Sequence, residues 1–365
     1  MQASGRNAGL GLALVSALAF GGSGVAAKPL IEAGLDPLHM VWLRVAGAAL
    51  VLSPLAWRHR DLVLRKPALL AGFGLLAVAG VQAFYFASIS RIPVGVALLL
   101  EYLGPALLLG YIRFVQRKPV SRAAAGGAAI AVAGLAFVVE IWAGLSLDPL
   151  GVLLGLAAAC CQACYFILAD QGSAGEDAPD PLGVIAYGMI VGALVLTVIA
   201  RPWNIDWQVL GGQASMDGTA VPAWLLLAWV VLVATCFAYV TGVVSVRRLS
   251  PQVAGVVAFL EAVTAVVFAW ILLGEQLSTP QVVGGALVLC GAFIAQTARS
   301  AGAPAEPVAQ GGPVVVVSEP GPLPDAGPAG GSLDGGDLDG GDLGGGDLDR
   351  GDLGGRVLDP GAKAT

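Results

Sequence analysis

Residues 117–134 read RKPVSRAAAGGAAIAVAG, and residues 275–292 read EQLSTPQVVGGALVLCGA. A shift of 158 positions (284 − 126 = 158) aligns the Gly-Gly pair at 126–127 with the pair at 284–285. Each stretch follows an apolar segment that carries one glutamate well inside it. The chain is therefore expected to contain an internal repeat, with one copy in each half.

Apolar segments recur along the chain between residues 9 and 298, and short polar breaks separate them. A helix needs about 20 apolar residues to cross the roughly 30 Å hydrocarbon core of a bilayer. Several breaks carry helix-start pairs such as Asp36-Pro37 and Thr279-Pro280. The expected spans are 9–27, 38–57, 68–89, 94–114, 122–140, 150–169, 182–200, 223–246, 252–273 and 281–298. The sequence predicts an all-α membrane protein with ten transmembrane helices.

Lysine and arginine are distributed unevenly between the loops. With the N-terminus inside, the cytoplasmic segments hold twelve of them, and the outer loops hold Lys28, Arg91 and Arg201. Five helices in a repeat is an odd number, so the second copy must be inverted relative to the first. We expect two inverted five-helix repeats, 1–142 and 148–299, with both termini cytoplasmic. Inverted repeats are typical of secondary transporters, whose substrate site lies at the repeat interface.

Composition excludes a soluble globular protein, because 57% of the residues are hydrophobic and only 12% are charged. Residues 300–365 hold 3 Lys+Arg and 11 Asp+Glu, a net charge of −8, which leaves +2 on the rest of the chain (−6 + 8 = +2). The acidic balance thus belongs to the tail, and nothing indicates nucleic-acid binding. This Gly/Asp/Pro-rich tail is expected to be disordered and cytoplasmic.

Motifs of catalysis and of metal binding are missing from the sequence. The two histidines, His39 and His59, lie at predicted helix edges, and no HExxH, G-x-S-x-G or Walker-type pattern occurs. The five cysteines all lie in apolar runs, where a thiol behaves as a small hydrophobic group. We expect no enzyme activity, no metal site and no cofactor.

Two glutamates lie well inside predicted spans. An ionised side chain near the bilayer centre costs about 2.5–3.5 kcal/mol on insertion scales, so it is a functional candidate by default. Glu101 lies about a third of the way into the fourth span, and Glu261 lies near the middle of the ninth. A carboxyl that takes up a proton and releases it when the cavity fills with water suits a proton-coupled carrier. The alternative is a neutral glutamate that is hydrogen-bonded to a neighbouring helix.

Further polar groups in the spans form a second tier of candidates. Arg44 could pair with a carboxylate or receive an anionic group of a substrate, and snorkelling to the headgroups is the alternative. Two Gln-x-x-Tyr pairs each share one helix face, which suits a polar cavity, although interhelical hydrogen bonds would explain them equally. The second-tier residues are Arg44, Gln82, Tyr85, Tyr102, Gln162, Tyr165, Thr235 and Tyr239.

A family resemblance rests on LEYLGP (100–105) and on FLEAVTAVVFAWILLGEQLS (259–278), which leads to Gly284-Gly285. With ten helices in two inverted repeats, residues 9–298 resemble EamA-type carriers of the drug/metabolite transporter superfamily, and LEYLGP looks most like the threonine/homoserine exporter branch. The resemblance implies export of small polar metabolites, amino acids among them, through a central cavity. Glu261-Ala262 stands where the family often has Glu-Pro, a departure that bears on whether the helix breaks there.

The leading hypothesis is a plasma-membrane secondary carrier that exports amino acids such as threonine or homoserine, coupled to protons through Glu101. Its partners would be a small polar metabolite and the lipid bilayer. A second copy of the chain, in a homodimer, is a further candidate partner. An importer or a drug-efflux carrier of the same fold is the nearest alternative. An alternative of another class is a non-transporting membrane scaffold that uses the acidic tail.

Overall fold

The computed structural model describes residues 2–140, 147–172, 179–246 and 251–300. The predicted tail 301–365 lies outside the described residues. Within them, eight helical segments are long and apolar enough to cross a membrane, and two shorter apolar helices, Phe259–Leu273 and Thr279–Ala295, follow. The eight are Ala8–Glu32, Pro37–Arg58, Pro67–Ile89, Val94–Val115, Arg122–Val139, Pro149–Leu168, Pro181–Ala200 and Ala223–Ser245. All ten overlap the predicted spans, because hydropathy alone sets where such segments lie.

Three of these segments change their helical type along their length, which the sequence did not predict. Each contains a π-helical stretch, whose wider turns are often found at functional sites. The third segment consists of α4 (Pro67–Gly72), η1 (Phe73–Gly80) and α5 (Val81–Ile89). The fourth consists of α6 (Val94–Glu101), α7 (Gly104–Gly110) and η2 (Tyr111–Val115). The eighth consists of α12 (Ala223–Ala228), η5 (Trp229–Phe237) and α13 (Ala238–Val246).

The fourth segment is also interrupted in its middle, where one continuous helix was expected. Helix α6 ends at Glu101, and α7 begins at Gly104. Pro105 has no N–H group and its ring clashes with the carbonyl four residues earlier, which is that of Glu101. Helix α14 (Pro251–Leu273) instead continues through Glu261. Ala262 follows Glu261 there, so the departure from Glu-Pro noted in the sequence coincides with an unbroken helix.

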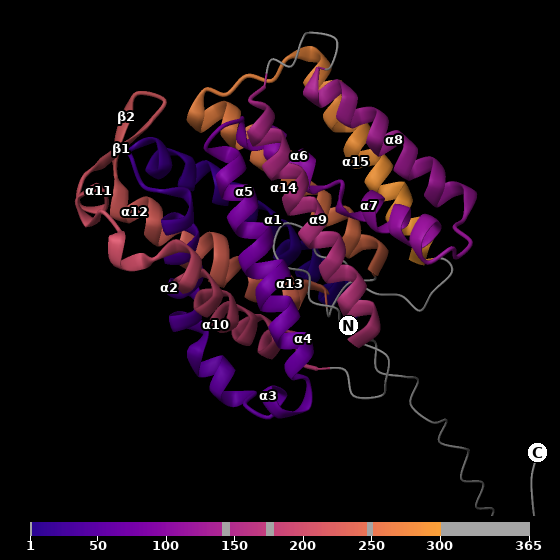
Figure 1. Ribbon diagram of the computed structural model, residues 1–365, viewed down its shortest axis with the longest axis horizontal. Helices are drawn as coiled ribbons and strands as arrows, with labels where there is room; N and C mark the ends of the chain where they lie inside the picture. Colours follow the sequence, from indigo (N-terminus) through magenta and orange to yellow (C-terminus); the bar gives the residue numbers. More distant parts are fainter. Residues whose placement is uncertain (1, 141–146, 173–178, 247–250, 301–365) are drawn as a thin grey trace, which may run out of the picture. The chain divides into compact units, whose positions relative to one another are not determined.

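Helices α8 (Arg122–Val139) and α15 (Thr279–Ser300) carry the two aligned glycine stretches and pack against each other (Figure 1). A Cβ atom on Gly134 would lie 2.7 Å from the Gly284 carbonyl oxygen, and one on Gly127 would lie 2.7 Å from that of Gly291. Residue numbers rise on one helix while they fall on the other, so the pair is antiparallel. Glycine at these positions lets the two backbones touch.

The other long helices pair in a pattern that mixes the two halves of the sequence. Helix α1 (Gln2–Glu32) packs on α14, α13 and η5, and α2 (Pro37–Arg58) packs on α10 (Pro181–Ala200). Helix α9 (Pro149–Gly172) packs on α5, α6 and α7. The first half therefore contacts the second along most of its helices, and a large apolar core joins them.

Helix α1 is longer than its predicted span and runs through Lys28 and Pro29 to Glu32. The prediction that Lys28 lies in an outer loop was therefore wrong. Its side chain is only 15% exposed and forms an ion pair with Glu275, so the charge that suggested a loop is neutralised inside the fold.

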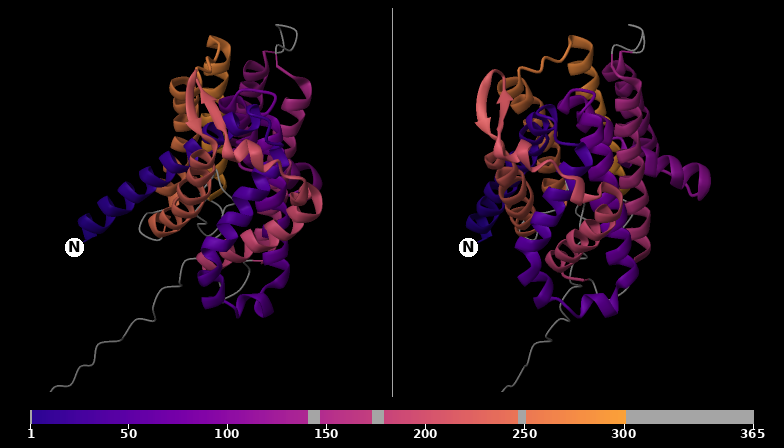
Figure 2. Two further views of the ribbon diagram at one scale, coloured as in Figure 1. Left: turned by 90° about the vertical axis from the view of Figure 1, so that its left-hand side faces the viewer. Right: turned by 60° about the vertical axis from the view of Figure 1, so that its left-hand side comes forward.

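A small hairpin was also missed by the sequence analysis. Strands β1 (Gln213–Met216) and β2 (Thr219–Pro222) pair antiparallel in the connection between α10 and α12, as the two arrows in Figure 2 show. Asp217 and Gly218 form its turn and both have positive φ angles, which suits an Asp-Gly hairpin. The remaining short elements are α3 (Leu62–Arg65), η4 (Pro202–Asn204) and α11 (Trp207–Gly211).

Candidate functional site

Arg44 is buried in the middle of the helices. It is 2% exposed, which contradicts the alternative in which it snorkels to the headgroups. Its Nε donates to the Thr235 hydroxyl and its Nη1 to the Gln82 side-chain oxygen, each at 2.8 Å. Its guanidinium carbon lies 5.3 Å from the ring centroid of Phe86. Contacts from α5 and from η5 thus hold the guanidinium in place.

Thr235 is anchored by its own helix. Its hydroxyl donates to the carbonyl of Val230, five residues earlier, at 2.7 Å, which matches the wider π-helical turn of η5. The same oxygen accepts the hydrogen bond from Arg44. Thr235 is therefore bonded on both sides, and its position fixes that of the arginine.

Glu101 and Glu261 lie near this arginine on two different helices, α6 and α14. They are 5% and 3% exposed, and both interact electrostatically with Arg44 and with each other. Among the described residues, neither carboxylate is within ion-pair distance of Arg44. One cation and two carboxyl groups thus interact electrostatically without forming an ion pair among the described residues.

Tyrosines from both halves surround these charges. Tyr85 and Tyr239 interact electrostatically with Arg44, Glu101 and Glu261. The Tyr239 hydroxyl is buried without a hydrogen-bond partner among the described residues, and its ring packs edge-on against Phe20. Polar atoms of this kind are rare in protein interiors unless a ligand or water completes them.

Tyr102 connects the helix break to α14. It follows Glu101 directly, and its ring centroid lies 5.5 Å from that of Phe259. It also interacts electrostatically with Glu261 and Tyr85. The break in the fourth segment therefore faces the helix that carries the second buried carboxyl.

The second Gln-x-x-Tyr pair lies on α9, beside the first group of residues. Tyr165 interacts electrostatically with Tyr239 and stacks edge-on with Phe73. Gln162 packs directly on Gly104, and its side-chain oxygen has no hydrogen-bond partner among the described residues. Gln162 is thus placed next to the helix break and, among the described residues, forms no hydrogen bond with Arg44.

All ten predicted site residues are buried, each no more than 7% exposed. They come from α2, α5, α6 and the break that follows α6 before residue 140, and from α9, η5, α13 and α14 after it. We call eight of them the central cluster, namely Arg44 and the two glutamates together with the residues that hydrogen-bond or interact electrostatically with one of these three charged groups. The central cluster consists of Arg44, Gln82, Tyr85, Glu101, Tyr102, Thr235, Tyr239 and Glu261.

A second polar group joins the two halves at one end of the helices. The Lys28 ammonium donates to Glu275 Oε1 at 2.5 Å, and Glu275 Oε2 accepts the backbone N–H of Val94 at 2.9 Å. Val94 is the first residue of α6, where a negative charge is favourable. The Ser278 hydroxyl donates to Glu140, which adds another link between the halves. The sequence analysis assigned no role to these residues.

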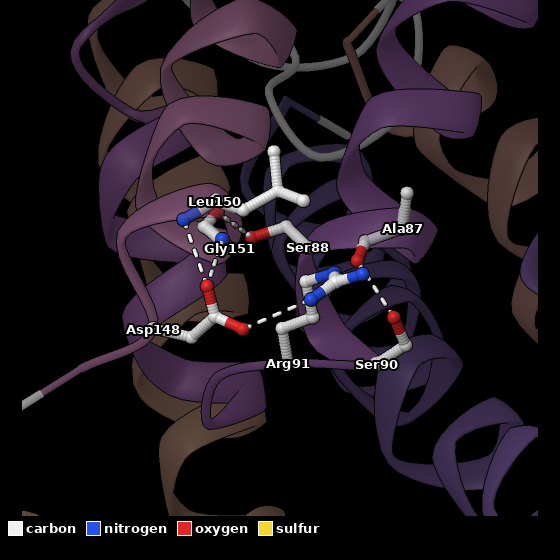
Figure 3. A network of polar contacts seen from close by, with 7 residues as sticks. All are labelled: Ala87, Ser88, Ser90, Arg91, Asp148, Leu150 and Gly151. Atoms are coloured by element: carbon white, nitrogen blue, oxygen red, sulfur yellow. Dashed lines mark hydrogen bonds and ion pairs between the residues drawn. The ribbon is translucent and has the colours of Figure 1, made fainter.

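Arg91 and Asp148 form a second ion pair at the same end, with Arg91 Nη1 3.0 Å from Asp148 Oδ2 (Figure 3). Asp148 Oδ1 also accepts the backbone N–H groups of Leu150 and Gly151, at the start of α9. The Ser88 hydroxyl donates to the Gly151 carbonyl at 2.8 Å. The Arg91 hydrogen bond, together with these N–H groups, holds the pKa of Asp148 below its usual value.

The sequence analysis missed Phe86, which lies next to the central cluster. It follows Tyr85, and only its position under a buried guanidinium distinguishes it from other core aromatics.

Among the described residues, no group of three histidine, cysteine, aspartate or glutamate side chains is placed to hold a metal ion.

Comparison with protein families gives one match that spans both halves. Residues 7–140 and 149–297 match the EamA-like transporter family. The boundary between the two matched segments falls between α8 and α9, so each segment contributes to the central cluster.

Individual relatives give a similar result. The chain is 29% identical over 261 residues to the threonine/homoserine exporter RhtA of Escherichia coli K12, covering 71% of this chain and 79% of that protein. It is 26% identical over 229 residues to a probable amino-acid metabolite efflux pump of Salmonella typhimurium LT2, covering 62% and 75%. A solved crystal structure matches with a TM-score of 0.52 at 18% identity, covering 82% of this chain and all of the other. That last likeness bears on the fold alone.

Proposed function

The chain belongs to the EamA-like transporter family, and from this premise we propose that it is a proton-coupled secondary carrier that exports small amino acids such as threonine or homoserine. It would act in the plasma membrane with both termini in the cytoplasm. The activities for which two of the relatives are named support an amino-acid substrate. The observation that carries the proposal is the buried central cluster, which places two carboxyl groups beside one arginine.

Two inverted five-helix repeats, 1–142 and 148–299, would build this carrier. The antiparallel packing of α8 and α15 supports the inversion, because the last helices of two inverted repeats must run in opposite directions. The distribution of lysine and arginine supports the orientation. Alternating access would then move one repeat against the other around the central cluster.

Glu101 is our first choice for the coupling group. Its place at the end of α6, beside the helix break, would let a small backbone movement change its access to water. Protonation would remove its charge and weaken its attraction to Arg44, which links proton binding to the state of the substrate site. Glu261, on the unbroken α14, would balance the remaining charge.

Transport by the purified protein in liposomes tests this proposal. We expect efflux of labelled homoserine to accelerate when a proton gradient is imposed, and Glu101→Gln to lose this acceleration. Glu32→Gln is the matched control, because Glu32 is exposed at the end of α1. Flux that does not depend on pH, or that Glu101→Gln leaves unchanged, would contradict the coupling role.

Two experiments separate the alternatives. Accumulation of labelled substrate in intact cells, with and without the gene, distinguishes an exporter from an importer. Deletion of residues 300–365 should leave the flux of a carrier intact, whereas a scaffold that uses its acidic tail would lose its activity.

A further inference from the structure

We propose that Arg44 is the receptor for the carboxylate of a zwitterionic α-amino acid, held in position by Gln82 and Thr235. The inference rests on the proposed carrier function and specifies how its site selects substrates. It concerns which charged groups a substrate must carry, whereas the coupling role of Glu101 concerns protons.

The hydrogen-bond inventory of Arg44 leaves room for a ligand. A guanidinium has five N–H donors, and the described residues use two of them, one for Thr235 and one for Gln82. Three donors (5 − 2 = 3) thus have no partner among the described residues, although the side chain is 2% exposed. A carboxylate accepts two parallel N–H bonds from a guanidinium, so these free donors suit a bound carboxylate.

The surroundings of Arg44 determine which side of the guanidinium is free. Thr235 and Gln82 occupy the Nε and one position on Nη1, and Phe86 lies next to the planar group. The Tyr239 hydroxyl, which interacts electrostatically with Arg44, is buried and has no partner among the described residues. A bound carboxylate would satisfy both groups, because the guanidinium and the phenol are donors.

The two glutamates suit the other charge of the same molecule. Glu101 and Glu261 interact electrostatically with Arg44 but do not form an ion pair with it in the described structure. An ammonium group could therefore bind a carboxylate on one side while the substrate carboxylate binds Arg44 on the other. A zwitterion adds no net charge to this buried cluster, whereas an amine or a carboxylic acid alone adds one.

Substrate analogues that differ from homoserine by one group test the inference. 3-Aminopropan-1-ol lacks only the carboxylate, and 4-hydroxybutanoate lacks only the ammonium. In liposomes that exchange labelled homoserine, we expect unlabelled homoserine to compete at least about tenfold better than either analogue, as expected for the loss of a charged hydrogen-bond partner. Equal competition by 3-aminopropan-1-ol would overturn the role of Arg44, while the exchange itself would leave the carrier function standing. Absence of any homoserine exchange would overturn the carrier function proposed above.

Substitutions of the positioning residue give a second readout. Thr235→Val keeps the shape and removes the hydroxyl that accepts from Arg44, so KM should rise about tenfold with a smaller change in kcat. Thr235→Ser keeps the hydroxyl and should restore most of the affinity. Arg44→Lys should lose the bidentate contact with the substrate carboxylate and raise KM further. Thermal unfolding of each variant in detergent checks that it is folded, and equal KM values for Thr235→Val and Thr235→Ser would contradict the inference.

Discussion

Lys28 and Glu275 lie 247 positions apart in the sequence and form an ion pair of 2.5 Å between α1 and the segment that follows α14. Glu275 also accepts the N–H of Val94, so one carboxylate connects α1, α6 and the end of α14. Both side chains of the pair are largely buried, at 15% and 12% exposed. Breaking such a pair leaves the remaining charge poorly solvated, which costs more than the loss of an exposed pair.

We predict that Glu275→Gln lowers the free energy of unfolding by about 3 kcal/mol. The glutamine could still accept the N–H of Val94, so the loss reports mainly the uncompensated Lys28 ammonium. Thermal or denaturant unfolding of the detergent-purified protein measures it.

The control for this prediction exchanges the two charges. Lys28→Glu combined with Glu275→Lys should recover part of the stability, but only part, because a lysine at 275 cannot accept the Val94 N–H. A Glu275→Gln protein as stable as wild type would show that the pair contributes little.

Acidification should weaken the contact between Arg91 and Asp148. The pKa of Asp148 is below its usual value in the folded protein, chiefly because Arg91 donates a hydrogen bond to it. A carboxyl whose pKa is lower in the folded state stabilises the fold above its unfolded-state pKa, and this contribution disappears as the pH falls through the folded-state pKa. We expect the difference in melting temperature between wild type and Asp148→Asn to shrink from pH 7 to pH 3.

Asparagine is a matched replacement at 148, because it can still accept the N–H groups at the start of α9 and removes only the charge. A melting-temperature difference that stays constant down to pH 3 would contradict the predicted dependence on ionised Asp148.

Gly127 and its neighbour Gly126 provide a paired test of the α8–α15 contact. A Cβ atom at 127 would lie 2.5 Å from the Ala295 backbone nitrogen, whereas a Cβ atom at 126 meets nothing within 4 Å. Gly127→Ala should therefore separate the backbones and destabilise the protein by about 1–3 kcal/mol. Gly126→Ala should leave stability equal or higher, because alanine favours helix. If both variants melt at the same temperature, the close contact is not needed for stability.

The sequence predicted the positions of the helices well. A long apolar segment in a bilayer must satisfy its backbone hydrogen bonds internally, and a helix does so; the few charged residues, 12% of the chain, separate these segments clearly. The ten polar residues that it singled out are all buried, and their role in transport stays a prediction. Lys28 was misplaced because a charge before Pro29 resembles a loop, and its partner lies too far along the chain to be recognised. The π-helical turns of η5 had no sequence signal that we used.

Pairing within the site was beyond the reach of local patterns. Arg44 could have paired with a carboxylate, yet it bonds Gln82 and Thr235. The Gln-x-x-Tyr repeat suggested two equivalent faces, but Gln82 contacts the arginine and Gln162 packs on Gly104. Helix packing, which depends on the whole chain, decides between such partners.

The burial of Arg44 has a consequence for how the chain is made. During synthesis, Arg44 precedes Gln82 by 38 positions and precedes Thr235 by 191 positions. When α2 enters the bilayer, neither partner has yet been made, and an arginine inside a span carries an insertion cost that reaches about 2.5–3.5 kcal/mol at the helix centre. The apolar residues of α2 must offset this cost alone, and the arginine acquires its full set of bonds only after the eighth segment has been inserted. A nascent chain that stops before that point would leave a cation incompletely paired in the membrane.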